Sequence, residues 1–250
     1  MSTTWINYIQ SELKKIPRSS PTTDFFLESF YKRNKPVHFF LDNWKALGWT
    51  MPILVERLGA IPVEIQWNRT SDPDYELNSY SHKNVVPFNE FAGMMESRLA
   101  NDVYMTAQNK SANEAALSLL WGDVGPLPDF LDPDPSMGFF WLGQNTMTPL
   151  HHDETNNVMC HVMGTKLVRM FSPDQRDKLD PGLGVHSRLG WVTENMIAER
   201  GLRPMDVWLT PGDALFIPIG WWHCVKSIGV ACTIVYTSFI WQNFWGKVPG

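Results

Sequence analysis

The chain has 250 residues, a formal net charge of −5 and 44% hydrophobic residues, which is enough apolar content for a sizeable core. The charge excludes a general attraction to phosphate backbones, and no apolar run reaches the about 18 residues of a membrane span. We therefore expect neither a nucleic-acid nor a membrane partner. Met1–Lys15 has no apolar signal segment, and Cys160, Cys224 and Cys232 lack a CxxC spacing, so we expect a cytoplasmic protein with reduced thiols.

Residues 1–137 predict mainly helices, with some strands. The apolar spacing and capping residues predict helices over Trp5–Lys14, over Phe25–Tyr31 capped by Asp24, over Met51–Leu58 capped by Thr50, and over Asn89–Ser97. Pro36–Leu41 and Ile61–Trp67 have the pattern of short strands. Residues 122–138 contain four prolines and four aspartates, so we expect this segment to be largely irregular.

Residues 138–241 predict a β-rich unit. Turn-forming residues separate seven short apolar runs, which predict strands over Gly138–Gln144, Asn157–Met163, Lys166–Phe171, Val207–Thr210, Ala214–Pro218, His223–Lys226 and Ala231–Ile240. Short strands at this spacing are typical of a barrel or a sandwich. Residues 172–206 interrupt the pattern and include a helical stretch at Glu194–Arg200, so we expect an insertion on the barrel.

Metal-ligating residue types are concentrated in the segment from Thr148 to Glu154. Alternate residues of a strand share a face, so His151 would pair with Asp153, or His152 with Glu154. Such pairs arise by chance in a chain with 7 histidines and 26 acidic residues. A histidine held by a neighbouring carboxylate on a surface turn is therefore an equally simple interpretation.

A further histidine strengthens the metal interpretation. His223 follows a Gly-Trp-Trp sequence and begins a predicted strand, and strands distant in sequence can be neighbours in a barrel. His223 could then join His151 and Asp153. Two imidazoles and one carboxylate suit non-haem iron and oxygen chemistry, although zinc accepts the same ligands.

Lys166 begins a predicted strand after Gly164-Thr165. A lysine inside a barrel is costly unless an anion pairs with it. One interpretation is that Lys166 points outward, as most lysines do. The other is that it binds the carboxylate of a small acidic cosubstrate through a charge-assisted hydrogen bond.

Several segments together resemble the JmjC/cupin-like hydroxylases, which are Fe(II)- and 2-oxoglutarate-dependent oxygenases. The matching sequences are TPLHHDETNN, HVMGTK, SPDQ and PGDALFIPIGWWH, preceded by RNKPV, YMTAQ and FWLG in the same order. The likeness is strongest to the factor-inhibiting-HIF-type branch and covers most of the chain. It implies one domain over 1–250, mainly β with α additions: a jelly-roll (cupin, double-stranded β-helix) barrel over 138–241 with an N-terminal helical part.

The resemblance also implies roles for individual residues. His151, Asp153 and His223 would be the iron ligands, with His152 and Glu154 facing away. Lys166 and Thr148 would bind 2-oxoglutarate, and Tyr104 and Asn157 would lie near it. Ser238 would stand where the asparaginyl hydroxylases have an asparagine near this cosubstrate. His161 would contact substrate or be a hydrogen-bonded core residue.

The predicted activity is a dioxygenase reaction with Fe(II), 2-oxoglutarate and O2. It would hydroxylate an amino-acid side chain in a protein or peptide, or a small amino-acid-like molecule, between lips formed by residues 123–137 and 179–201. The alternatives are a metal cupin that acts as an isomerase or hydrolase with zinc or another ion, and a non-catalytic binding module. The aromatic C-terminus, with Phe239, Trp241, Phe244 and Trp245, would form a homodimer face or pack on its own barrel.

Overall fold

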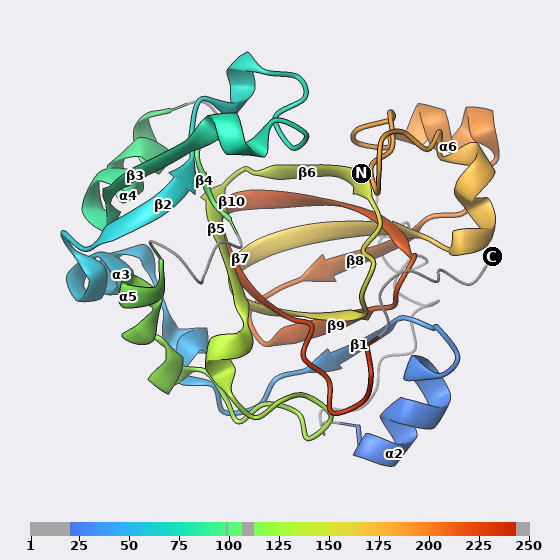
Figure 1. Cartoon of the computed structure of the whole chain (residues 1–250), viewed down its shortest axis with the longest axis horizontal. Helices are drawn as coiled ribbons and strands as arrows, with labels where there is room; N and C mark the ends of the chain where they lie inside the picture. The colour runs from blue at the N-terminus through green and yellow to red at the C-terminus, as the bar shows by residue number, and fades with distance from the viewer. Residues whose placement is uncertain (1–20, 99, 107–112, 244–250) are drawn as a thin grey trace, which may run out of the picture.

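The protein is built on a β-sheet that curls into a barrel (Figure 1). The computed structural model describes residues 21–98, 100–106 and 113–243, and in this part of the chain ten antiparallel strands form one sheet. The strands are β1 Val37–Phe40, β2 Pro62–Gln66, β3 Lys83–Pro87, β4 Tyr104–Met105, β5 Phe139–Gln144, β6 Met147–His151, β7 Asn157–Phe171, β8 Met205–Leu209, β9 Asp213–Ile217 and β10 Trp222–Tyr236.

Helices are short and lie outside the barrel (Figure 1). The α-helices are α2 Thr23–Phe26, α3 Met51–Leu58, α4 Phe88–Ser97, α5 Glu114–Ser118 and α6 Glu194–Arg200, and a π-helical turn, Leu27–Tyr31, continues α2. Single 3-10 turns occur at Lys45–Gly48, Arg69–Ser71, Ser79–His82, Trp121–Asp123, Pro135–Met137 and Pro173–Lys178. None of the described helices has the length and apolarity needed to cross a membrane.

Two long strands organise the barrel. β7 and β10 pair from Phe171 opposite Trp222 to Val158 opposite Tyr236. On its other edge β7 pairs with β9 in its first half and with β8 in its second, while β10 pairs with β6 and then with β5. Each long strand therefore bridges two shorter ones, which produces the predicted jelly-roll barrel with its helical additions.

The sequence pattern predicts four short strands where the structure has the two long strands β7 and β10, and this prediction was wrong. Gly164-Thr165 predicts a turn from its sequence, but β7 continues through this point. Gly164 has a φ of +77°, and a Cβ there would lie 2.0 Å from the carbonyl oxygen of Val230. The glycine therefore allows two strands to approach closely at an irregular point in their register, between Ile228 and Cys232, without ending either strand.

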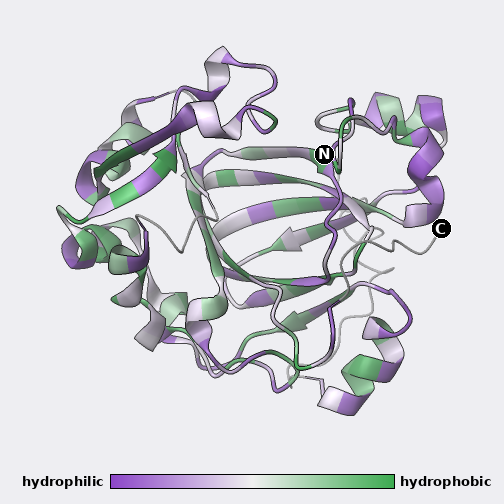
Figure 2. Ribbon diagram, in the orientation of Figure 1, coloured by the Kyte–Doolittle hydropathy of each residue, from purple (hydrophilic) through white to green (hydrophobic). Residues whose placement is uncertain are grey.

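The N-terminal part covers one side of the barrel and shares its largest apolar core. Phe26 of α2 stacks on Phe130 at 3.8 Å between ring centroids and meets Phe216 of β9 edge-on at 4.9 Å. The C-terminal residues Phe239 and Trp241 stack on the same Phe26 ring at 6.2 and 6.3 Å. Figure 2 shows apolar colour along the strands and polar colour on α6.

Helix boundaries follow the capping residues, with one correction. Thr50 caps α3 as predicted, because its Oγ1 accepts a hydrogen bond from the Ile53 amide (3.5 Å). Thr22 rather than Asp24 caps α2, since Thr22 Oγ1 accepts from the Phe25 amide (3.4 Å) and Asp24 lies within the first turn. The predicted helix Trp5–Lys14 and the aromatic residues Phe244 and Trp245 lie outside the described residues.

Candidate active site

A β-bulge in β6 directs two site residues to the same side. His151 lies opposite His223 of β10, and Thr148 lies opposite Val225. The two positions are three residues apart on β6 but only two residues apart on β10, so β6 has one extra residue here. In a regular strand, residues three apart point to opposite faces. The extra residue in the bulge lets both Thr148 and His151 line the interior cavity.

Three side chains meet at one end of this cavity. The imidazole centroids of His151 and His223 are 4.3 Å apart. Asp153 Oδ1 is 3.9 Å from Nε2 of His151, and its Oδ2 is 3.8 Å from Nε2 of His223. One ligand atom from each residue lies within 4.8 Å of the others, which is close enough for the three to hold one metal ion.

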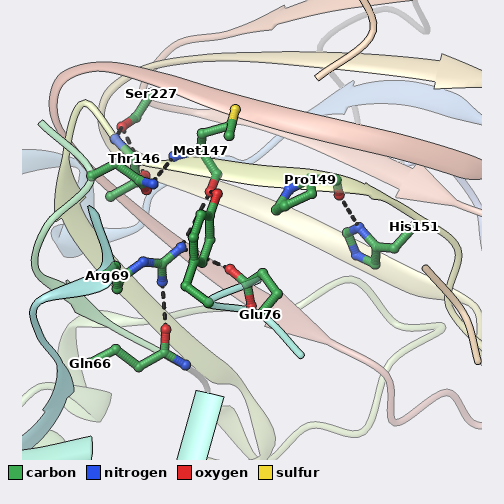
Figure 3. Close-up of polar contacts among 10 residues, drawn as sticks. Gln66, Arg69, Glu76, Thr146, Met147, Pro149, His151 and Ser227 are labelled. Carbon is green, nitrogen blue, oxygen red and sulfur yellow. Dashed lines mark hydrogen bonds and ion pairs between the residues drawn. The ribbon is translucent and has the colours of Figure 1, made fainter. Parts of the chain in front are cut away.

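Backbone carbonyls determine which nitrogen of each imidazole is free. Nδ1 of His151 lies 2.8 Å from the Pro149 carbonyl (Figure 3), and Nδ1 of His223 lies 3.0 Å from the Trp221 carbonyl. Only a protonated nitrogen can donate to a carbonyl, so these contacts favour the neutral tautomer in which Nε2 carries the lone pair. Burial lowers the pKa of His223 to about 4, and the nearby His151 adds to this effect, so His223 is neutral.

Asn157 orients the carboxylate of the three-residue cluster. Its Nδ2 donates to Asp153 Oδ2 at 2.5 Å. Its own Oδ1 is buried and has no hydrogen-bond partner among the described residues. The amide therefore holds Asp153 in place and offers an acceptor to a bound molecule.

The cavity has a volume of about 420 Å³, which is within the range of sites for small molecules. Its walls are largely apolar and are formed by Phe139, Trp141, Met159, Val185, Val225 and Val235. The polar side chains besides the three clustered residues are Tyr104, Thr148, His152, Glu154, Thr155, Asn157, Lys166 and Thr237. This composition suits a small molecule with a few polar groups bound between largely apolar walls.

Lys166 points into the barrel and not to solvent. Lys166 is 2% exposed and lines the cavity, and its side-chain amine forms no hydrogen bond or ion pair with a residue that the structure describes. Burial lowers its pKa to about 8, so the amine is still mostly protonated at neutral pH. An unpaired buried cation is costly, and an anion bound in the cavity would offset that cost.

Tyr104 and Thr148 line the same cavity as Lys166, but Ser238 does not. The Ser238 carbonyl accepts from the Asp132 amide, and the neighbouring Thr237 lines the cavity in its place. β10 ends at Tyr236, two residues before Ser238, and a role of Ser238 at the cosubstrate stays a prediction.

His161 is a core residue. It is fully buried, and its ring nitrogens lie 3.0 Å from Thr233 Oγ1 and 3.0 Å from the Gly164 carbonyl. Both hydrogen-bonding positions are therefore used within the core. Burial lowers its pKa to about 4, and the nearby Lys166 contributes.

The resemblance implies that His152 and Glu154 face away from the metal ligands, and neither belongs to the cluster that could hold an ion, but their place in the cavity wall was missed. β6 ends at His151, so strand alternation no longer applies, and both residues border the cavity. The His152 ring packs edge-on against Trp222 at 4.6 Å, and its Nδ1 is buried without a partner among the described residues.

His186 was also missed, because it lies in the predicted insertion and has no informative spacing. It forms an isolated β-bridge with His151, and their ring centroids are 6.1 Å apart. Two backbone hydrogen bonds also join the insertion to this segment: the Leu150 amide donates to the Gly190 carbonyl, and the His152 amide donates to the Val185 carbonyl. It therefore covers the outer edge of the strand that carries the first histidine.

The residues fit an iron ion and a keto diacid. Two imidazoles and a carboxylate leave other coordination positions open, which is the donor set of non-haem iron oxygenases. Lys166 supplies an unpaired cation elsewhere in the same cavity, as the second carboxylate of a diacid requires.

Comparison with known proteins agrees with this geometry. Residues 22–245 match the model of the cupin-like domain family. The chain is 25% identical over 249 residues to "Lysine-specific demethylase JMJ31" of Arabidopsis thaliana, covering 83% of this chain and 44% of that protein. It is 26% identical over 254 residues to "Lysine-specific demethylase 8" of Danio rerio, covering 92% of this chain and 59% of that protein.

A shorter match reaches 33% identity over 111 residues with "Lysine-specific demethylase JMJ30" of Arabidopsis thaliana, covering 41% of this chain and 25% of that protein. The chain thus spans between a quarter and three fifths of the length of these three curated relatives. Special closeness to the factor-inhibiting-HIF-type branch stays a prediction. The barrel and the match over residues 22–245 show that the chain belongs to the cupin-like domain family.

Proposed function

We propose that this chain is an oxygenase that hydroxylates an amino-acid side chain of a protein or peptide, using Fe(II), 2-oxoglutarate and O2. One observation carries the proposal. A single cavity combines three metal-ligand atoms within 4.8 Å of one another and a buried lysine without a partner in the described part of the chain. A zinc hydrolase or isomerase has no need of such a lysine.

His151, Asp153 and His223 would hold the iron, and Lys166 and Thr148 would hold the far carboxylate of 2-oxoglutarate, beside Tyr104. When bound, iron and 2-oxoglutarate supply the oxidising chemistry, in which one oxygen atom of O2 enters succinate, CO2 is released and the other oxygen atom becomes the product hydroxyl.

The chain's own contribution is position and exclusion of water. The two Nδ1–carbonyl hydrogen bonds fix the imidazole planes, and Asn157 fixes the carboxylate. The largely apolar walls of the cavity would limit the water around the substrate carbon once a substrate is bound. Such positioning matters because a misplacement of ~1 Å can cost about 100-fold in rate.

A second candidate reaction is oxidation of an N-methyl group on a cationic side chain. The exposed carboxylate of Glu154 borders the cavity, as does the aromatic ring of Trp141. Carboxylates and aromatic rings both attract cations. Hydroxylation of an N-methyl carbon leads to loss of formaldehyde, so the same site would then act as a demethylase. The three relatives described above are named as lysine demethylases.

The test combines binding and turnover. With Mn(II) in place of iron, calorimetry should detect 2-oxoglutarate binding to the wild type without any substrate. With Fe(II) and air, the wild type should form succinate, whereas the Asp153→Ala variant and the zinc-loaded wild type should not, since zinc has no redox chemistry.

Mass spectrometry of a peptide library then separates the two reactions. Gain of one oxygen atom supports hydroxylation, while loss of a methyl group with formaldehyde supports demethylation. Absence of both 2-oxoglutarate binding and succinate from the wild type would contradict the proposal and favour a binding module or a different metal enzyme.

A further inference from the structure

A fully buried arginine lies behind one wall of the cavity. Arg69 follows β2 and has no solvent exposure. Its guanidinium donates to Gln66 Oε1 at 2.6 Å, to Glu76 Oε1 at 2.8 Å and to the Met147 carbonyl at 3.3 Å (Figure 3). The three acceptors come from three separate segments of the chain, so the guanidinium links them.

The same guanidinium lies between two aromatic rings. Its carbon is 4.3 Å from the Tyr75 centroid and 5.0 Å from the Tyr104 centroid. Cation–π contacts of this kind are stronger in a desolvated site. Tyr104 is one of the residues that line the cavity, where its ring also lies 5.6 Å from that of Trp141 between centroids. Arg69 therefore supports the Tyr104 ring from behind.

Arg69 also helps to fix the start of β6. The Met147 carbonyl that it contacts accepts a second hydrogen bond, from Tyr75 Oη at 2.9 Å. The Met147 amide donates to Asn101 Oδ1 at 2.8 Å. Side chains thus hold the backbone on this edge of β6, and the next residue in the strand is Thr148.

No strand pairing connects Tyr104 directly to Thr148. Tyr104 belongs to β4, which pairs with β2 and β5, whereas Thr148 belongs to β6, which pairs with β10. Arg69 touches the ring of the first residue and the backbone just before the second. It is thus a direct physical link between two walls of the cavity.

We propose that Arg69 is a positioning residue that sets the spacing of Tyr104 and Thr148 around the far carboxylate of 2-oxoglutarate. This inference rests on the proposed function. It requires an arginine, because only a planar guanidinium can stack between two rings and also donate to three acceptors. Glu76, which is largely buried, pairs with the charge and makes its burial tolerable.

The test is 2-oxoglutarate affinity in an Arg69→Lys variant. We expect the dissociation constant of 2-oxoglutarate, measured by calorimetry on the Mn(II)-loaded protein, to rise by about 10-fold or more, because the fork and both ring contacts are lost. The dissociation constant of Mn(II) itself should change by less than about 2-fold, since the metal ligands are untouched. In turnover, the KM for 2-oxoglutarate should rise while kcat at saturation is retained.

Arg169→Lys is the matched control. Arg169 is the other buried arginine with carboxylate partners in the described chain, and it does not line the cavity. The control should lose thermal stability but keep the wild-type affinity for 2-oxoglutarate. An equal loss of affinity in both variants would overturn the inference, because it would show a general effect of destabilisation.

A milder variant guards against failure to fold. Tyr75→Phe keeps the ring beside Arg69 but removes the hydrogen bond to Met147, and we expect 2-oxoglutarate affinity to fall about 3-fold. Wild-type affinity in both Tyr75→Phe and a folded Arg69→Lys would overturn the inference and leave the proposed function standing. Failure of the wild type to bind 2-oxoglutarate would instead overturn the proposed function.

Discussion

The two faces of β7 each carry a buried cationic side chain, and the two side chains differ in whether they have ionic partners. Lys166 and Arg169 are three residues apart, so strand alternation directs them to opposite faces. Both are almost fully buried, with 2% and 5% exposure. Inside the barrel, Lys166 has no partner among the described residues, whereas outside the barrel Arg169 is paired throughout.

Arg169 illustrates how a buried charge serves structure. Its guanidinium donates to both carboxylate oxygens of Asp206 at 2.8 and 2.6 Å, to Glu194 at 2.6 Å and to the Val192 carbonyl at 2.8 Å. These bonds join β7 to β8 and to the insertion that carries α6. Four of the five N–H donors of this guanidinium are thus used within the protein, and its charge is already paired with carboxylates. The lesson is that the missing partner, and not burial alone, marks Lys166 as a binding residue.

The largest expected effect is on metal binding, which should differ between variants at two adjacent residues of β10. His223→Ala should abolish Mn(II) or Fe(II) binding, because it removes one of three ligands. Cys224→Ala should leave metal affinity unchanged, because Cys224 packs in a separate apolar cluster and burial raises its thiol pKa to about 12. Calorimetric titration of the metal checks both variants, and metal loss in Cys224→Ala would contradict the assignment of the two faces.

The next largest expected effect is the loss of stability on removal of the Arg169 side chain. Arg169→Met should lower the free energy of unfolding by about 3–5 kcal/mol, because it leaves the carboxylate of Asp206 buried and unpaired. Urea denaturation measures the loss. Arg188→Met is the control, since its ion pair with Asp180 is exposed and should contribute no more than ~1 kcal/mol. Similar losses in both variants would refute the structural role.

The unpaired cation should behave in the reverse manner. Lys166→Met should weaken 2-oxoglutarate binding by about 100-fold, since the ligand carboxylate loses its charged partner. In the absence of ligand, the variant should be more stable than the wild type by on the order of 3 kcal/mol, the cost implied by lowering a lysine pKa from 10.5 to about 8. Thermal unfolding and calorimetry measure the two effects, and a loss of both stability and affinity would show that Lys166 is structural.

The smallest expected effect is a dependence on pH. The protonated amine binds the anion, so 2-oxoglutarate affinity should be constant below pH 7 and fall by up to about 10-fold per unit above pH 8, the pKa of Lys166 in the free protein. Over the same range the unfolded chain binds more protons than the folded one. Stability of the ligand-free protein should therefore rise with pH between about 8 and 10.5. Neither trend should persist in Lys166→Met, and an unchanged pH profile in that variant would assign the titration to another group.

Local rules of sequence were sufficient for much of the fold. The capping threonine and the glycine after Leu58 predicted α3 to the residue, and turn residues located most of the strands. They failed at Gly164, because a positive φ is compatible with either a turn or a closely packed irregular strand. They also missed the place of His152 in the cavity wall, because alternation is informative only while the strand lasts.

The sequence by itself determined which side chains are available: two histidines and an aspartate with ligand chemistry, and a lysine at the start of an apolar run. Only the tertiary structure decided that His223 faces His151, that the Lys166 amine points inward without a partner among the described residues, and that Arg69 supports Tyr104. The reason is physical. Side-chain direction within a strand follows from local geometry, but the meeting of residues far apart in the chain depends on strand register, and the bulge in β6 shifts that register by one residue.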